Sequence, residues 1–174
     1  MAWIFSLSAE CGSKQEDAEK FAQYFDNILL TLSNGTQSQC QVNVFQDIEE
    51  NWWCRVYPNN ISEVGVDTAE SAYLMTEIGI LLYKYLRESP SFRYALVGIE
   101  VDEFRTYNEL REELPNLSFP GLVIAESVWN HTFSSEYFRP FRLGYLWKPY
   151  EGEVYKPLIA SSDLKNKLNE LLSV

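Results

Sequence analysis

The sequence predicts a single α+β domain over residues 1–174, with a core in residues 1–104 and a C-terminal extension in residues 105–174 that packs on it. Three observations support this class. Strand and helix patterns alternate along the chain, and no linker or internal repeat separates them. Hydrophobic residues make up 46% of the chain, which is enough to build one core of this size without disulfides or metals.

The chain opens with a strand pattern followed by a helix pattern. Alternating apolar residues predict a strand over residues 2–8. Ser13 and Glu16 have the spacing of a capping box, so a helix is expected to begin there. Apolar residues at helical spacing continue to Leu32, and Asn34-Gly35 is expected to end the helix, because both residues tolerate a left-handed backbone.

The middle of the chain predicts a hairpin, a second helix and a further strand. Apolar residues alternate over residues 40–44 and 52–56, and the polar residues 47–51 between them predict a turn. Residues 67–88 have the capping residues and apolar spacing of a helix, which Pro90 stops. Residues 94–101 are almost continuously apolar, as in a strand that is covered on both faces.

The resulting order of strand, helix, strand, strand, helix, strand resembles the split βαβ (βαββαβ) core of ferredoxin-like folds. The resemblance lies in the topology alone. In such a sheet both helices lie on one face, so the extension or a second subunit is expected to cover the other face. The extension itself predicts a short helix from Thr106, a C-terminal strand over residues 121–125, an aromatic-rich segment over residues 129–158, and a terminal helix over residues 162–172.

The charge of the chain restricts its partners. The formal net charge is −11, and residues 1–104 carry 16 acidic and 6 basic side chains, a net charge of −10. Such a field opposes binding to phosphate backbones, so nucleic acid is not expected as a partner. It favours a basic protein partner instead.

Cysteine usage and the N-terminus indicate a compartment. Cys11, Cys40 and Cys54 are odd in number and show no C-x-x-C spacing, which suits free thiols in a reducing cytoplasm. The first residues lack the basic region of a signal peptide, and no apolar run approaches the roughly 20 residues that span a bilayer. We therefore expect a cytoplasmic protein without a membrane partner.

Few residues are candidates for catalysis. His131 is the only histidine, and no partner for it is evident. Cys11 follows a strand and precedes a capped helix, a position where the helix dipole can favour a thiolate nucleophile. Glu10 beside it opposes that charge. Neither glycine-rich nucleotide-binding motif occurs, so no cofactor is predicted.

Carboxylates at predicted strand ends are candidate metal ligands. Mg²⁺ and Ca²⁺ prefer oxygen ligands, so several strand ends that meet at one edge of a sheet could hold such an ion. A solvated acidic rim is the alternative interpretation. The candidate ligands are Glu10, Glu100, Asp102 and Glu126.

One segment has the composition of a binding surface. Residues 137–150 interleave three cations with six aromatic residues and contain no acid. Such a segment could form the hot spot of an interface, hold an anion through arginine, or simply cover the sheet while its arginines pair with acids of the core. The candidate interaction residues are Tyr137, Phe138, Arg139, Phe141, Arg142 and Trp147.

These observations leave three functional hypotheses. The first is a cytoplasmic protein-binding or regulatory module with an acidic recognition surface, for example an immunity-like protein that neutralises a basic partner. The second is a small hydrolase or transferase that uses strand-end carboxylates with a divalent metal, or Cys11 as nucleophile. The third is a homo-oligomer, a ferredoxin-like dimer whose sheets pack face to face.

Overall fold

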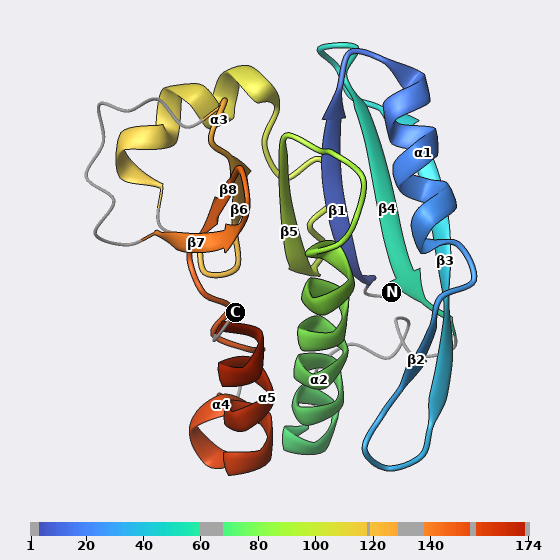
Figure 1. Ribbon diagram of the computed structural model, residues 1–174, viewed down its shortest axis with the longest axis vertical. Coiled ribbons are helices and arrows are strands. Elements are labelled where there is room, and N and C mark those ends of the chain that lie inside the picture. Colours follow the sequence, from blue (N-terminus) through green and yellow to red (C-terminus); the bar gives the residue numbers. More distant parts are fainter. Residues whose placement is uncertain (1–3, 60–67, 118, 129–137, 154–155, 173–174) are drawn as a thin grey trace.

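The computed structural model describes residues 4–59, 68–117, 119–128, 138–153 and 156–172. Within them it contains five α-helices, one short 3-10 helix (Leu114–Asn116) and one sheet of eight strands (Figure 1). The strand order is β2-β3-β4-β1-β5-β6-β8-β7, and every neighbouring pair is antiparallel. A fold that mixes helices with antiparallel strands is thus confirmed.

The strands differ greatly in length, and the longest lie in the first half of the chain. They are β1 (Phe5–Gly12), β2 (Leu29–Thr31), β3 (Gln37–Gln46), β4 (Trp52–Pro58), β5 (Tyr94–Ile99), β6 (Val123–Ala125), β7 (Arg139–Arg142) and β8 (Tyr145–Trp147).

The helices are α1 (Gln15–Phe25), α2 (Ala69–Leu86), α3 (Tyr107–Glu113), α4 (Pro157–Ala160) and α5 (Ser162–Leu172). Helices α1 and α2 lie on the same face of the sheet (Figure 1). Helix α1 packs on β1, β3 and β4, and α2 packs on β1 and β5. Helices α4 and α5 pack against α2 rather than on the strands. No helix among the described residues combines the length and apolar character that crossing a bilayer requires.

Strand β1 is the centre of the sheet and is buried on both faces. It lies between β4 and β5, with Leu7 opposite both Val56 and Val97. Because side chains alternate along a strand, Phe5, Leu7 and the residues at the same spacing face α1 and α2, whereas the serines and Glu10 face the opposite side. Here we call that opposite side the open face.

The helix expected to run from Ser13 to Leu32 is shorter than predicted. Helix α1 ends at Phe25, and the apolar residues that follow form β2. The backbone turns at Asn27, which has a φ of 67°. Asn34-Gly35 therefore closes the β2–β3 hairpin and does not end a helix, in keeping with the strong preference of Asn-Gly for hairpin turns.

Two of the predicted helix starts, at Ser13 and Thr106, lie among the described residues, and one of them is correct. The helix start predicted at Thr106 is correct, and Thr106 and Glu109 form a capping box there, with the Thr106 hydroxyl accepting from the Glu109 amide at 3.3 Å. The box predicted at Ser13 is wrong, because Lys14 is the N-cap residue and no side chain caps α1. Helix α2 begins with a box at Thr68 and Ser71, next to the predicted start.

The hairpin and the last helix agree with the sequence. Strands β3 and β4 pair with Val44 opposite Cys54, and α5 has the predicted bounds. The aromatic-rich segment contains two strands, β7 and β8, that the sequence did not indicate. They extend the sheet beyond β6, and the C-terminal half of the chain therefore lengthens the sheet more than it covers the open face.

A smaller cluster covers part of the open face. Trp53 is fully buried, and its ring lies 5.7 Å from Phe104 and 5.5 Å from Tyr94 in edge-to-face contacts. The Trp53 indole nitrogen donates to Asp47 at 2.7 Å. Phe104 in turn contacts Phe119, so the segment after β5 folds back over the sheet.

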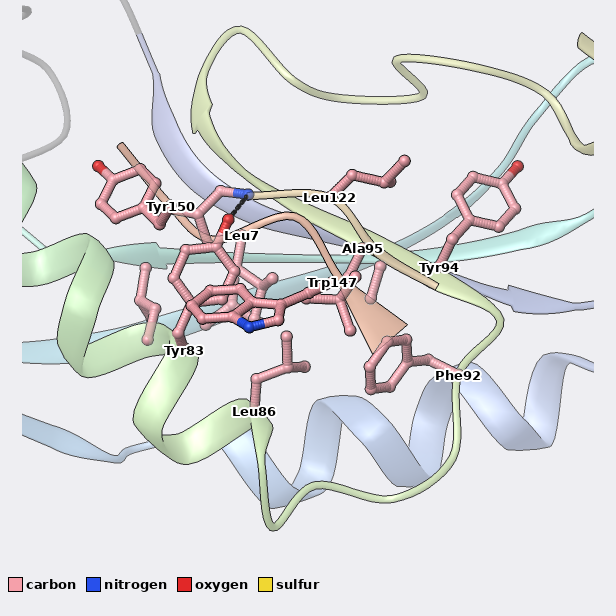
Figure 2. Close-up of a cluster of buried hydrophobic side chains, with 14 of the residues drawn as sticks. Leu7, Tyr83, Leu86, Phe92, Tyr94, Ala95, Leu122, Trp147 and Tyr150 are labelled. Carbon is pink, nitrogen blue, oxygen red and sulfur yellow. Dashed lines mark hydrogen bonds between the residues drawn. The ribbon is translucent and has the colours of Figure 1, made fainter. Parts of the chain in front are cut away.

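The main core lies between the sheet and α2 (Figure 2). Tyr83 is fully buried there beside Trp147, with ring centroids 5.1 Å apart. Its hydroxyl donates to the Gly121 carbonyl at 2.7 Å and accepts from the Val97 amide at 3.2 Å. Strand β6 pairs with β5 only at Tyr94 and Ala95, so Tyr83 satisfies a β5 amide that β6 is too short to reach.

Candidate functional site

The predicted metal ligands take part in separate contacts. Glu10 is fully buried and binds Arg93, whose Nε lies 2.7 Å from Oε1 and whose Nη2 contacts Oε2. Asp102 forms an ion pair with Arg55 at 2.6 Å. Glu100 is exposed and accepts from the Ile4 amide at 3.0 Å.

Glu126, the fourth candidate ligand, is exposed near the β7–β8 hairpin, where its backbone amide donates to Gly144. Among the described residues, no group of three or more His, Cys, Asp or Glu side chains is arranged to hold a metal ion. Arginines engage two of the predicted ligands, and the other two lie apart. The metal hypothesis therefore gains no support from these positions.

Glu10 and Arg93 join two neighbouring strands at the open face. Burial raises the pKa of the Glu10 carboxyl, and the hydrogen bond and charge of Arg93 partly offset that rise. The Gly12 amide also donates to Oε1 at 2.5 Å. The Arg93 guanidinium lies 3.8 Å from the ring centroid of Tyr107 in α3. These contacts fasten α3 to the sheet, which is a structural role.

Cys11 does not have the surroundings of a nucleophile. The residue is 6% exposed, and burial raises the pKa of its thiol well above the ordinary value, with Cys54 and Glu10 adding to the rise. A thiol with a raised pKa holds little thiolate at neutral pH, so the helix dipole proposed for this position does not dominate. His131 lies outside the described residues.

The aromatic and basic segment is divided between the core and the surface. Tyr137 lies outside the described residues. Phe138, Phe141 and Trp147 are 7%, 2% and 1% exposed, so each contributes mainly to packing. Arg139 is exposed on β7. Of the aromatic candidates that the structure describes, none presents an exposed ring to a partner.

Arg142 holds the β7–β8 hairpin against the end of α2. Its Nη1 donates to the carbonyl oxygens of Leu86, Arg87 and Ser89 at 3.1, 3.2 and 2.7 Å. Its guanidinium also stacks over the Tyr145 ring at 4.4 Å. The last carbonyls of a helix lack partners within the helix, and a cation there also complements the helix dipole. This arginine is therefore committed to the fold and not to binding an anion.

The hairpin that Arg142 anchors forms one wall of a groove. Helix α2 forms the second wall and α5 the third, and the groove encloses about 870 Å³. We call it the α2–α5 groove. The side chains that line it are Ile80, Leu81, Lys84, Arg87, Glu88, Glu126, Pro140, Phe141, Arg142, Leu143, Tyr145, Lys167 and Glu170.

The rim of the groove carries an unusually exposed apolar side chain. Leu143 is 100% exposed at the tip of the hairpin, where Gly144 has a φ of 83° and completes the two-residue turn. Phe141 and Ile80 are buried below it, and Leu81 is half-buried. A fully exposed leucine beside an apolar wall gains by contact with another apolar surface.

The cations of the groove are largely engaged by the chain itself. Lys167 donates to the buried Glu77 at 3.1 Å, Arg142 binds the α2 carbonyls, and Arg87 lies over the Phe141 ring at 5.9 Å. Glu88 and Glu126 are exposed and form no ion pair with any residue that the structure describes. Lys84 is exposed as well. The charges open to a partner are therefore mainly negative.

Sequence reasoning missed this groove because its walls come from three distant segments. The hairpin belongs to a segment that showed no strand pattern, and α5 was predicted as a terminal helix without a part in any site. Arg-Leu-Gly-Tyr over residues 142–145 was the available signal, since a glycine after an apolar residue is suited to a tight turn that exposes that residue.

A second polar cluster lies on the open face beside the Arg55–Asp102 ion pair. The hydroxyls of Ser6 and Ser8 are buried and make no hydrogen bond with any described residue, and the same is true of Arg55 Nε and Asp102 Oδ1. Ser8 lies directly opposite Arg55 in the β1–β4 pairing. Buried polar atoms of this kind commonly bind water.

The chain matches no protein-family model, and no curated protein or solved structure is significantly similar to it.

Proposed function

We propose that this protein is a protein-binding module that holds a basic, partly apolar segment of its partner in the α2–α5 groove. The observation that carries the proposal is the fully exposed Leu143 above the apolar wall of that groove. A regulatory or immunity-like module that neutralises a basic partner is the biological form that we propose.

The size of the groove suits a segment of a partner rather than a whole domain. A volume of about 870 Å³ lies in the range of clefts that bind small molecules or a few side chains. Leu143 and Phe141 on the hairpin and Leu81 on α2 all line the groove, as apolar residues do in sites that take the apolar face of a helix or short peptide.

Charge favours a basic segment. Glu88 and Glu126 at the groove are exposed, and the whole chain carries a net charge of −11. A cationic segment would be drawn toward this field, and its lysines or arginines could pair with these glutamates once its apolar side chains are in place. An acidic segment would meet repulsion instead.

A synthetic probe tests the proposal without knowledge of the partner. The probe is a dye-labelled amphipathic peptide of about 14 residues, with leucines on one helical face and lysines on the other. Its binding is measured by fluorescence anisotropy against the wild-type protein. We expect saturable binding that weakens as salt is added, and much weaker binding of a peptide in which glutamates replace the lysines.

Two variants locate the binding. Leu143→Asp changes the groove rim, and Ile159→Asp changes another exposed apolar residue, 80% exposed, that does not line the groove. Both side chains are exposed, so neither change should unfold the protein. We expect about tenfold weaker binding for Leu143→Asp and no change for Ile159→Asp. Equal affinities of the two variants, or equal binding of the glutamate peptide, would refute the proposal.

We also propose that β1, α1, β3, β4, α2 and β5 constitute a ferredoxin-like core. The order β3-β4-β1-β5, with every pair antiparallel and both helices on one face, supports this proposal. The hairpin strand β2 at one side and β6, β8 and β7 at the other are additions to that core. A solved structure in which the strand order differs would overturn it.

We propose a reducing compartment, the cytoplasm, as the place of action. Cys11, Cys40 and Cys54 are buried free thiols, and burial raises the pKa of Cys40 and of Cys54 to about 12. Such thiols resist oxidation but gain nothing from an oxidising environment. Fractionation of cells that express the tagged protein would test this placement.

A further inference from the structure

Strand β3 is paired on its outer side over less than half of its length. Strand β2 pairs with Gln37–Gln39, and the backbones of Asn27 and Ile28 exchange hydrogen bonds with Cys40 at 3.2 and 2.8 Å. From Gln41 to Gln46, β4 pairs with the inner side, but no described residue pairs with the outer side.

The outward groups of this edge can be identified from the strand alternation. Cys40 directs its backbone N–H and C=O outward, because the N–H donates to the Ile28 carbonyl and the C=O accepts from the Asn27 amide. Every second residue of an antiparallel strand points the same way, so Val42, Val44 and Gln46 also present their backbone groups outward. We call these positions the β3 edge.

The β3 edge lacks the features that normally prevent pairing. Residues 41–46 contain no charge, no proline and no glycine, and they include valine and phenylalanine, which favour strands. The opposite edge of the same sheet, β7, has the sequence Arg-Pro-Phe-Arg and a bulge against β8. Charges, proline and a bulge are the usual protections of an edge strand, so one edge is protected and the other is open.

Exposed apolar side chains lie at both ends of the β3 edge. Leu29, opposite Gln39, is 48% exposed, and Ile48, just beyond Gln46, is 89% exposed. They are two of the four large hydrophobic residues found exposed in the described part of the chain. If two copies pair through this edge, antiparallel and about a two-fold axis, the end of one copy that carries Ile48 lies next to the end of the other copy that carries Leu29.

We propose that the β3 edge pairs with the β3 edge of a second copy of this chain, antiparallel and about a two-fold axis at Val44. In this register Val44 faces its own counterpart, and Val42 faces Gln46 in both directions, so the outward backbone groups of all three residues are bonded. Ile48 lies in the turn after this pairing, near the Asn27–Ile28 backbone that already occupies the outer side of the other copy's Cys40, and near the exposed Leu29. A register centred on Asn43 is excluded, because Gln46 would face Cys40, whose backbone groups are already bonded.

The self-complementary ends favour a second copy over an extended segment of another protein. The pairing closes on itself and leaves the protected β7 edges at the outside, so it forms a dimer and not a filament. It differs from a dimer in which sheets stack face to face. The inference is independent of the proposed function, because the α2–α5 groove lies at the other end of the sheet (Figure 1).

Sedimentation velocity over a concentration series tests the dimer. The chain has a mass of 20.2 kDa, so we expect a second species of twice that mass at concentrations up to about 100 µM. The net charge of −11 on each copy opposes association, and added salt should therefore strengthen the dimer. A mass of one chain at every concentration and salt level would overturn the proposal.

Variants at the edge show where the dimer forms. Ile48→Asp alters an exposed side chain and should weaken dimerisation at least tenfold without loss of stability. Val44→Pro removes the outward N–H at the two-fold axis and should abolish the dimer, with folding checked by circular dichroism. Leu143→Asp, at the far end of the sheet, is the matched control and should leave the dimer intact.

Hydrogen exchange gives a second measurement that needs no substitution. The amides of Val42, Val44 and Gln46 should be slower to exchange at dimer-forming concentrations than after dilution. A dimer that persists in both Ile48→Asp and Val44→Pro, or whose formation leaves these amides unprotected, would refute the β3 edge as the interface.

Discussion

The Tyr83 hydroxyl is expected to stabilise the core through two buried hydrogen bonds. In the Tyr83→Phe variant the ring and its contact with Trp147 remain, but the Gly121 carbonyl and the Val97 amide lose their partner. Both groups lie in the buried core, and an unsatisfied buried polar group costs about 1–3 kcal/mol. We therefore expect a loss of about 2–4 kcal/mol in the free energy of unfolding.

Urea unfolding monitored by tryptophan fluorescence measures this loss, provided that the dependence on urea keeps the same slope. Tyr73→Phe on the same helix is the control, because its hydroxyl makes no hydrogen bond with any residue that the structure describes, and it should change stability little. A loss below about 0.5 kcal/mol for Tyr83→Phe would refute the proposed role of the hydroxyl.

The same site allows a test by coupling. Gly121 has a φ of 89°, and a Cβ placed there would lie 2.3 Å from the Tyr83 hydroxyl oxygen. Gly121→Ala should therefore be strongly destabilising in the wild-type protein. In the Tyr83→Phe background part of that clash is gone, so the additional loss should be smaller. Strictly additive losses would show that the two groups do not interact.

Three further predictions concern other parts of the structure. Burial raises the pKa of Glu153, and the hydrogen bond from Tyr150 only partly offsets that rise, so the folded state binds the proton more tightly than the unfolded state and stability falls as pH rises above the ordinary value of 4.5. In urea titrations from pH 4 to 8, Glu153→Gln should be more stable than wild type at pH 7 and lose that advantage toward pH 4. A constant difference between the two proteins would contradict this. Arg142→Lys should lower the free energy of unfolding by about 1–3 kcal/mol and speed amide exchange in β7 and β8, because one ammonium group cannot bond three carbonyls and also stack on a ring. Unchanged exchange would show that the hairpin does not need this anchor. Ser8→Ala should change the free energy of unfolding by less than about 0.5 kcal/mol, since the buried Ser8 hydroxyl has no described partner. A loss above about 1 kcal/mol, measured by thermal unfolding, would instead indicate a water bound at the Arg55–Asp102 cluster.

Local sequence patterns determined those elements whose formation depends on neighbouring residues. Thr106 and Glu109 cap α3 as predicted, because a capping box needs residues only three positions apart. The apolar spacing of α5 and the alternation in β3 and β4 were equally informative. The mixture of helices with antiparallel strands followed from these elements alone.

The tertiary structure decided the features that depend on contacts between distant residues. Leu29–Thr31 continue a helical pattern, yet they form a strand because β3 offers them a pairing edge. Arg142 looked like part of a binding surface, but carbonyls at and just after the end of α2, 53 to 56 residues away, take up its hydrogen bonds. Charge pattern alone could not show that Glu10 is neutralised by Arg93 inside the protein.

The physical reason for this division is the range of the interactions. Caps, turns and periodicity are set within a few residues, so the sequence by itself determined them. The α2–α5 groove and the open β3 edge arise where segments far apart in the chain meet or fail to meet. Their existence depends on sheet order and strand length, which only the packed structure decides.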